Sequence, residues 1–174
     1  MGGIFALKVC VYAICKNESQ FVDRFMDSMS EADYVCVLDT GSSDDTVERL
    51  RARGAIVGET VVSPWRFDTA RNESLGLIPA DADICCAIDL DEQFHPGWRA
   101  ALERAWQPDT TRARYRYTWS FRPDGSEGMV FWADKIHKNG CYRWASPVHE
   151  TLSYTGEGAE RFVDAAGVQL DHHP

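Results

Sequence analysis

Short apolar runs that alternate with helix-like segments dominate the first half of the chain. Residues 7–14 form the first run, which is almost wholly apolar, as is typical of a strand that is covered on both faces. Similar runs at residues 34–38, 55–62 and 83–88 predict three further strands. Because strands that alternate with helices form mainly parallel sheets with right-handed crossovers, we expect an α/β fold.

The segments between these runs have helical patterns. Apolar residues at positions 21, 22, 25, 26 and 29 form one stripe on a helix. Residues 45–53 predict a second helix, with Ser42 and Asp45 as a capping box and Gly54 as a C-terminal cap. A third helix is predicted over residues 68–77, where it ends before a proline.

The pattern changes after residue 92. A helix is predicted from residue 95 to residue 106, and residues 112–121 then alternate in the manner of a strand. Residues 129–132 predict its antiparallel partner, and residues 168–170 a last short strand. No repeat or low-complexity linker marks a boundary, so we expect a single domain over residues 1–174 with an antiparallel C-terminal part.

Charge and composition exclude several classes of protein. The chain has 18 Lys and Arg against 27 Asp and Glu, a net charge of −9, which argues against nucleic-acid partners and anionic membranes. No apolar run approaches the roughly 18 to 20 residues of a transmembrane segment. Residues 1–6 have no basic segment, and Ala6 stands where a myristoylation signal needs Ser or Thr, so neither secretion nor lipidation is expected. Six cysteines without a C-x-x-C pair favour reduced thiols, and we expect a cytoplasmic protein.

Polar segments follow the predicted strands, and ligands of open parallel sheets bind beyond the carboxyl ends of the strands. Asp89 and Asp91 come directly after the fourth strand, two residues apart, where both can face one hard cation such as Mg²⁺ or Mn²⁺. Acidic residues in such places are also common helix caps and solvated turns. Asp39 is equally compatible with a simple turn. Both alternatives stay open for these aspartates.

Five ordered segments carry a more specific signal. They are residues 13–18, 37–46, 67–72 and 88–92, followed by Pro147-Val148-His149-Glu150. Together they resemble family 2 glycosyltransferases of the GT-A fold. The last segment is similar to one in the subgroup of lipopolysaccharide-core β-glucosyltransferases and peptide S-glycosyltransferases. The resemblance implies a Rossmann-like, mainly parallel sheet flanked by helices. It also implies inverting transfer of a sugar from a nucleotide-diphosphate donor, preferably UDP-linked, to a glycan, lipid-linked or peptide acceptor.

The resemblance also implies roles for single residues. The nucleotide-sugar would be bound by Ala13, Ile14, Asn17, Glu18, Asp39, Arg71, Asp89 and Leu90. Asp39 would accept a hydrogen bond from the base, and Asp89 would contact the ribose or a metal-bound water. Asp91 would bind the metal together with His172, with His173 as the rival of His172. An imidazole ligand favours Mn²⁺ over Mg²⁺ as the cofactor.

The metal would stabilise the charge that grows on the departing nucleoside diphosphate, so no general acid is needed. A carboxylate must act as general base on the acceptor, and the resemblance favours Glu150, with Asp134 second. A surface ion pair with Arg143 is the alternative role for Glu150. Six tryptophans mostly indicate core packing, although Trp119 and Trp132 could stack on sugars.

Two other functions stay open. A non-catalytic nucleotide-sugar-binding module would keep Asp39 and Asp91 but not need Glu150. A nucleotidyltransferase would normally have a Gly-rich, basic loop after the first strand, which residues 13–18 lack. Since the sequence ends close to His172, the resemblance implies a compact or truncated catalytic core, completed by a further C-terminal module or by a homo-oligomer.

Overall fold

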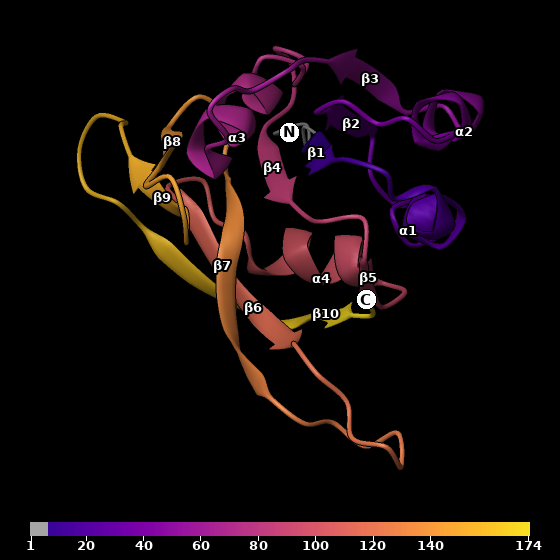
Figure 1. Ribbon diagram of the computed structural model, residues 1–174. Helices are drawn as coiled ribbons and strands as arrows, with labels where there is room; N and C mark the ends of the chain where they lie inside the picture. Colours follow the sequence, from indigo (N-terminus) through magenta and orange to yellow (C-terminus); the bar gives the residue numbers. More distant parts are fainter. Residues whose placement is uncertain (1–6) are drawn as a thin grey trace.

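The computed structural model describes residues 7–174 (Figure 1). The segment considered above for secretion and lipidation, residues 1–6, lies outside the described residues. Four parallel strands pair in the order β3-β2-β1-β4, as the alternating pattern predicts. They are β1 (Val9–Cys15), β2 (Tyr34–Asp39), β3 (Ile56–Glu59) and β4 (Ile84–Ala87). The connecting helices are η1 (Ser19–Phe21), α1 (Val22–Ser28), α2 (Thr46–Ala52) and α3 (Phe67–Leu75).

The C-terminal half extends the same sheet beyond β4 in the order β7-β6-β10-β5. Antiparallel pairing joins β4 to β7, β7 to β6 and β10 to β5, while β6 and β10 run parallel. In Figure 1 the β6–β7 hairpin projects away from the rest of the molecule. The bounds are β5 (Glu92–Phe94), α4 (Trp98–Ala105), β6 (Arg112–Thr118), β7 (Val130–Lys138) and β10 (Phe162–His172), with a separate hairpin of β8 (Tyr142–Ala145) and β9 (Thr151–Tyr154).

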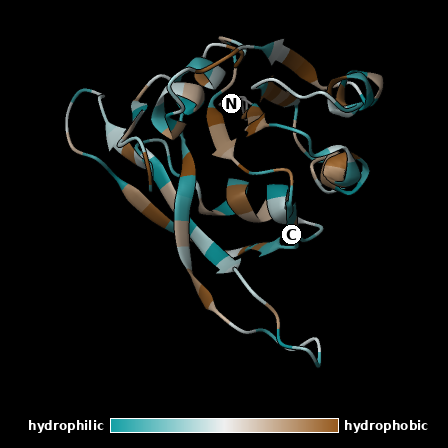
Figure 2. Ribbon diagram, viewed as in Figure 1, coloured by the Kyte–Doolittle hydropathy of each residue, from teal (hydrophilic) through white to brown (hydrophobic). Residues whose placement is uncertain are grey.

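Both faces of the parallel part are covered. All seven residues of β1 are buried. One face packs against α1, α2 and α4, and the other packs against the end of α3 and the β8–β9 hairpin. Figure 2 shows the central strands as hydrophobic and the helices as mixed. All six cysteines are free, and five of them are buried.

Several elements differ from the predictions. β5, β8 and β9 were not predicted, because each has only three or four residues and carries polar side chains. The last strand begins at Phe162 rather than at residue 168, since an irregular register between Asp164 and Gln169 interrupts its pattern. The capping box is wrong: α2 has no side-chain cap. Gly54 does adopt the predicted left-handed conformation after α2, with φ 89°. Within residues 7–174, no helix has the length and apolar character that crossing a membrane requires.

Candidate active site

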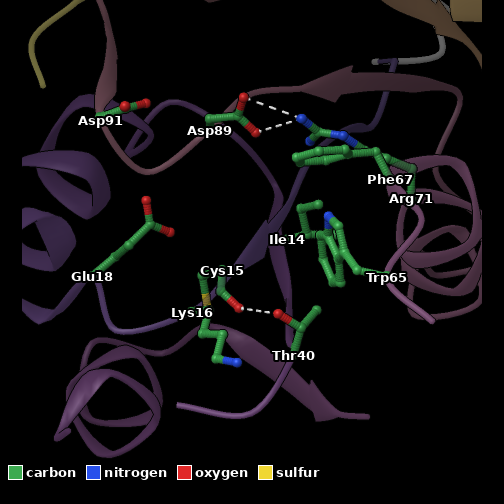
Figure 3. Close-up of a pocket in the computed structure, with 10 residues that line it drawn as sticks. All are labelled: Ile14, Cys15, Lys16, Glu18, Thr40, Trp65, Phe67, Arg71, Asp89 and Asp91. Atoms are coloured by element: carbon green, nitrogen blue, oxygen red, sulfur yellow. Dashed lines mark hydrogen bonds and ion pairs between the residues drawn. The ribbon is translucent and has the colours of Figure 1, made fainter. Parts of the chain in front are cut away.

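A cleft of about 260 Å³ opens where the loops after β1, β2 and β4 converge (Figure 3). Glu18 and Asp91 lie on one side of it, and Trp65 and Phe67 on the other. This first cleft is at the sheet edge where the sequence predicts a ligand. Its lining residues are Ile14, Cys15, Lys16, Glu18, Thr40, Trp65, Phe67, Arg71, Asp89 and Asp91.

Asp39 lies beneath the turn that follows β2. Its carboxylate accepts hydrogen bonds from the backbone N–H groups of Gly41 at 3.0 Å and Ser42 at 2.9 Å, and from the Ser42 hydroxyl. Asn17, whose φ is 55°, accepts the Ser43 N–H at 2.7 Å through its side chain. These bonds fix the two turns against each other. They leave Asp39 only 2% exposed, and neither Asp39 nor Asn17 lines the first cleft.

Two further residues of the predicted nucleotide-sugar set, Ala13 and Leu90, lie in the hydrophobic core with fully buried side chains. Strand alternation explains Ala13, because its neighbour Ile14 takes the opposite face and lines the cleft. Side-chain contacts with a ligand are therefore open to Ile14 but not to Ala13 or Leu90.

Arg71, on α3, is the buried cation of the first cleft. It forms ion pairs with Asp89 at 2.8 Å and with Glu150 at 3.2 Å, and its guanidinium lies 5.4 Å from the centre of the Trp144 ring. Burial would lower the pKa of Arg71, but the charges of Asp89 and Glu150 outweigh it and hold the pKa above its usual value. The Nη1 atom is buried and has no hydrogen-bond partner among the described residues.

Asn72, the next residue on α3, attaches the β8 strand beside this site. Its amide nitrogen donates to the Trp144 carbonyl at 2.8 Å, and its amide oxygen accepts the Trp144 N–H at 2.9 Å. The Trp144 indole N–H then donates to the buried Tyr12 hydroxyl at 3.0 Å. Through these bonds the loop that carries Glu150 is held against α3.

The two predicted general bases are not together. Glu150 is the counterion of Arg71, with its side chain 13% exposed, rather than a partner of Arg143 or a free carboxylate. Asp134, on β7, pairs with Arg112 at 3.1 Å and lines neither cleft described here. The neighbouring arginines of β6 are also paired, Arg114 with Asp164 and Arg116 with Glu127.

Asp91 and His172 do meet, with 3.2 Å between Oδ2 and Nε2. The other ring nitrogen of His172, Nδ1, lies 2.9 Å from the Trp119 carbonyl oxygen. A carbonyl oxygen can only accept, so Nδ1 carries a hydrogen, and Nε2 faces Asp91 at hydrogen-bond distance. His173, the rival candidate, has its ring stacked on Phe121 with 5.0 Å between the ring centroids.

The place where the loops after β1 and β4 meet is strongly acidic, because it holds Glu18, Asp89 and Asp91. Burial, followed by the nearby charges of Asp91 and Asp89, raises the pKa of Glu18 to about 7. For Asp89, burial acts in the same direction, but the charges of Arg71 and Lys135 outweigh it and leave the pKa below its usual value. A cation placed beside Glu18 and Asp91 would relieve the repulsion between them.

The raised pKa of Glu18 predicts a pH-dependent stability difference between the wild type and Glu18→Gln in metal-free buffer. Near pH 4.5 the two should be closely similar. Between about pH 4.5 and 7 the unfolded chain loses the Glu18 proton while the native chain retains it, so the variant should become relatively more stable over this range, and the difference should level off above about pH 7. Urea unfolding at several pH values measures this.

The comparison must be made as a difference between the two proteins. His137 has a pKa lowered by burial to about 4, and a buried neutral histidine gives stability that increases with pH over much of the same range. Glu18→Gln leaves that contribution unchanged. A pH-independent difference between the two proteins would contradict the assigned environment of Glu18.

A second cleft of about 300 Å³ adjoins the first and shares Asp89 and Asp91 with it. Its remaining lining residues are Glu92, Tyr115, Tyr117, Trp119, Phe131, Ala133, Lys135 and His172. Glu92 accepts hydrogen bonds from the Asp89 N–H at 2.8 Å and from the Tyr117 hydroxyl at 2.7 Å. Burial, followed by the charge of Asp89, raises the pKa of Glu92 to about 7.

Four lining residues had no role predicted from the sequence: Lys16, Trp65 and Glu92, which lie in segments expected at the ligand edge, and Lys135. The period-2 alternation of β7 would have found Lys135, but the predicted strand ended at residue 132, before it. Glu92 follows the Asp89-x-Asp91 motif directly, which was a usable signal. Trp65 precedes α3 in an irregular segment, where the sheet rule indicates the edge of the sheet but no local pattern indicates the direction of the side chain.

No family model matches the chain. Its structure is similar to that of glucosyl-3-phosphoglycerate synthase from Mycobacterium tuberculosis in complex with Mn²⁺, UDP and phosphoglyceric acid, with a TM-score of 0.53 and 27% identity. Structures of this synthase with Mg²⁺ and UDP, and with Mn²⁺ and UDP-glucose, match with a TM-score of 0.53 each and with 27% and 26% identity.

Each of these similarities covers 64% of this chain and 44% of the synthase chain. The chain thus matches less than half of the length of these synthases. The predicted GT-A-type architecture, a mainly parallel sheet flanked by helices with an antiparallel C-terminal part, is confirmed.

Proposed function

We propose that this chain is the catalytic domain of a glycosyltransferase that moves a sugar from a UDP-sugar to an acceptor with the help of a divalent cation. The observation that carries the proposal is the pair of Asp91 and His172, 3.2 Å apart at the junction of the two clefts. The synthase structures with UDP or UDP-glucose and Mn²⁺ or Mg²⁺ support it. Membership of family 2, the inverting course and the subgroup rest on the five sequence segments. The single domain and the cytoplasmic location stay predictions.

The donor set of the proposed metal site fits Mn²⁺ or Mg²⁺. Two neighbouring ligands of an octahedral ion at about 2.1 Å lie about 3.0 Å apart, close to the separation of Asp91 and His172. The Nε2 lone pair and the carboxylate oxygen are both acceptors, so their close approach needs a proton or a cation between them. Among residues 7–174 no third His, Cys, Asp or Glu completes a cluster, so the remaining ligands would be phosphate oxygens and water.

The cation would supply Lewis-acid stabilisation of the leaving diphosphate. Arg71 contributes from the chain itself, because its unpartnered Nη1 is a donor for an anionic or polar ligand in the first cleft. Asp89 and Glu150 hold the guanidinium in place. Glu150 is therefore a positioning residue in this proposal.

The second cleft would take the acceptor, because it meets the first at Asp89 and Asp91, where the sugar would be exchanged. Neither Glu150 nor Asp134 lines it. We therefore propose that the general base, which takes the proton from the acceptor, is a carboxylate of the second cleft and not Glu150 or Asp134.

The test is a thermal-unfolding panel with UDP, GDP, CDP, ADP and TDP, each with and without Mn²⁺, followed by turnover of UDP-sugars. A ligand at 100 times its Kd adds about 2.7 kcal/mol, which should raise the Tm by roughly 5 to 10 °C. UDP should give this shift only with Mn²⁺. If UDP binds but no UDP-sugar is turned over to release UDP, the non-catalytic module is favoured. If none of the five nucleotides raises the Tm, the proposed donor site is contradicted.

Trp65 gives a separate prediction for the nucleotide. Its side chain lines the first cleft and is 46% exposed, so its ring is available to stack on a base. Trp65→Ala should weaken UDP binding about 5- to 150-fold, and Trp65→Phe should restore most of the affinity. Isothermal titration with Mn²⁺ present measures both.

Trp132 is the matched control, because it is 52% exposed and lines neither cleft. Trp132→Ala should bind UDP as the wild type does. If Trp65→Ala also retained the wild-type affinity for UDP, the base would not stack on Trp65.

A further inference from the structure

Lys135 differs from the other cations near the active site. It lines the second cleft together with Asp89, Asp91 and Glu92, and within residues 7–174 no other lysine or arginine lines that cleft. Its ammonium has no hydrogen-bond or ion-pair partner in the described part of the chain. By contrast, the β6 arginines beside it are each paired with a carboxylate.

The carboxylates of the second cleft already have closer partners. Asp89 pairs with Arg71 at 2.8 Å, and Asp91 lies 3.2 Å from His172. Glu92 accepts hydrogen bonds from Tyr117 and from the Asp89 backbone. Within residues 7–174 no hydrogen bond or ion pair joins Lys135 to any of these carboxylates, so its three N–H donors are left for another group.

The position of Lys135 suits a ligand that reaches the sugar. Its neighbour Ile136 pairs with Cys86 on β4 in the last β4–β7 pair, so Lys135 lies just beyond that pair, towards the carboxyl end of β4 that Asp89 follows. Phe131 and Tyr117 lie opposite each other farther along the β6–β7 hairpin, and their rings pack edge to face at 5.2 Å. Aromatic walls beside a charge lower the local dielectric and strengthen attraction between charges.

We propose that Lys135 determines acceptor specificity by binding an anionic group, a carboxylate or a phosphate, on the acceptor. The proposal rests on the proposed function, since it takes the second cleft as the acceptor side. A neutral acceptor would cover the ammonium without giving it a hydrogen-bond acceptor, and this penalty is a means of discrimination.

The experiment is isothermal titration of the full chain saturated with UDP and Mn²⁺. Two matched series serve as probes: glycerol, glycerate and 3-phosphoglycerate, and glucose, glucuronate and glucose 6-phosphate. At least one anion should bind more tightly than its neutral counterpart. Lys135→Met should weaken that binding about 10- to 100-fold, and Lys135→Arg should retain most of it. The preferred member of each series distinguishes carboxylate from phosphate.

Lys138→Met is the control, because it removes the same charge from the same strand at a residue outside both clefts. It should bind the anion as the wild type does. The proposal is overturned if no anion binds better than its neutral counterpart, if no probe binds at all, or if Lys135→Met and Lys138→Met behave alike. UDP binding is measured first for each protein, so a failure of the donor site is recognised separately.

Discussion

Arg71→Met should lower the free energy of unfolding by about 3 kcal/mol, because it leaves two carboxylates without their cation. Glu150 has a side chain that is only 13% exposed, and it has no other ion-pair partner within residues 7–174. Asp89 is 34% exposed and keeps part of its hydration, which places the expected cost at the lower end for buried pairs. Methionine retains an unbranched stem for packing. Urea unfolding in metal-free buffer measures the change.

A double-mutant cycle with Glu150→Gln separates the ion pair from general packing. Arg71→Met should cost less in the Glu150→Gln background than in the wild type, by about 0.5 to 3 kcal/mol. Arg114→Met is the matched control, since the exposed pair of Arg114 and Asp164 should contribute less than about 1 kcal/mol. An equal cost of Arg71→Met in both backgrounds would show that the pair with Glu150 contributes nothing.

Glu150→Gln also distinguishes the two roles considered for this residue. Loss of a general base lowers kcat by about 10²- to 10⁴-fold without changing UDP affinity. Loss of a positioning residue instead weakens UDP binding and stability together, because Arg71 is no longer held. The structure leads us to expect the second result. A large fall in kcat with unchanged UDP affinity would restore Glu150 as the base.

The parallel half of the fold was predictable because its strands are buried on both faces and are therefore almost continuously apolar. The burial of every residue in β1 is the physical origin of that signal. The strands β8 and β9 have no such signal, since they pair with each other and alternate between buried and exposed positions over four residues. Short elements of this kind are defined by tertiary contacts, here the Asn72 amide with Trp144.

The candidate site likewise has a part that was predictable from the sequence and a part that was not. Asp89 and Asp91 follow a buried strand, so the sheet rule alone places them at the correct edge. Glu150 and Asp134 lie in the C-terminal half, where the sequence gives residue types but not the face of the sheet. Their arginine partners, Arg71 and Arg112, come from 79 and 22 residues away in the chain, which no local pattern reports.

Asp91→Ala should abolish the Mn²⁺-dependent binding of UDP and lower sugar transfer by at least about 100-fold. Asp91 and His172 are the two chain ligands of the proposed site, and the stabilisation that a cation gives to a leaving diphosphate amounts to several kcal/mol. Thermal unfolding with UDP, with and without Mn²⁺, measures binding, and release of UDP from a UDP-sugar measures transfer. Asp109→Ala, at an exposed position outside both clefts, is the control and should keep both properties.

The same substitution should have the opposite effect on the metal-free protein. Asp91 raises the pKa of the half-buried Glu18, after burial itself, so removing its charge should relieve repulsion at the junction of the loops. Asp91→Ala should therefore be at least as stable as the wild type in buffer with a chelator, and less stable than the wild type once Mn²⁺ and UDP are added. This crossover identifies a metal ligand, because a merely structural aspartate would destabilise the protein under both conditions. A uniform loss of stability would therefore contradict the assignment of Asp91.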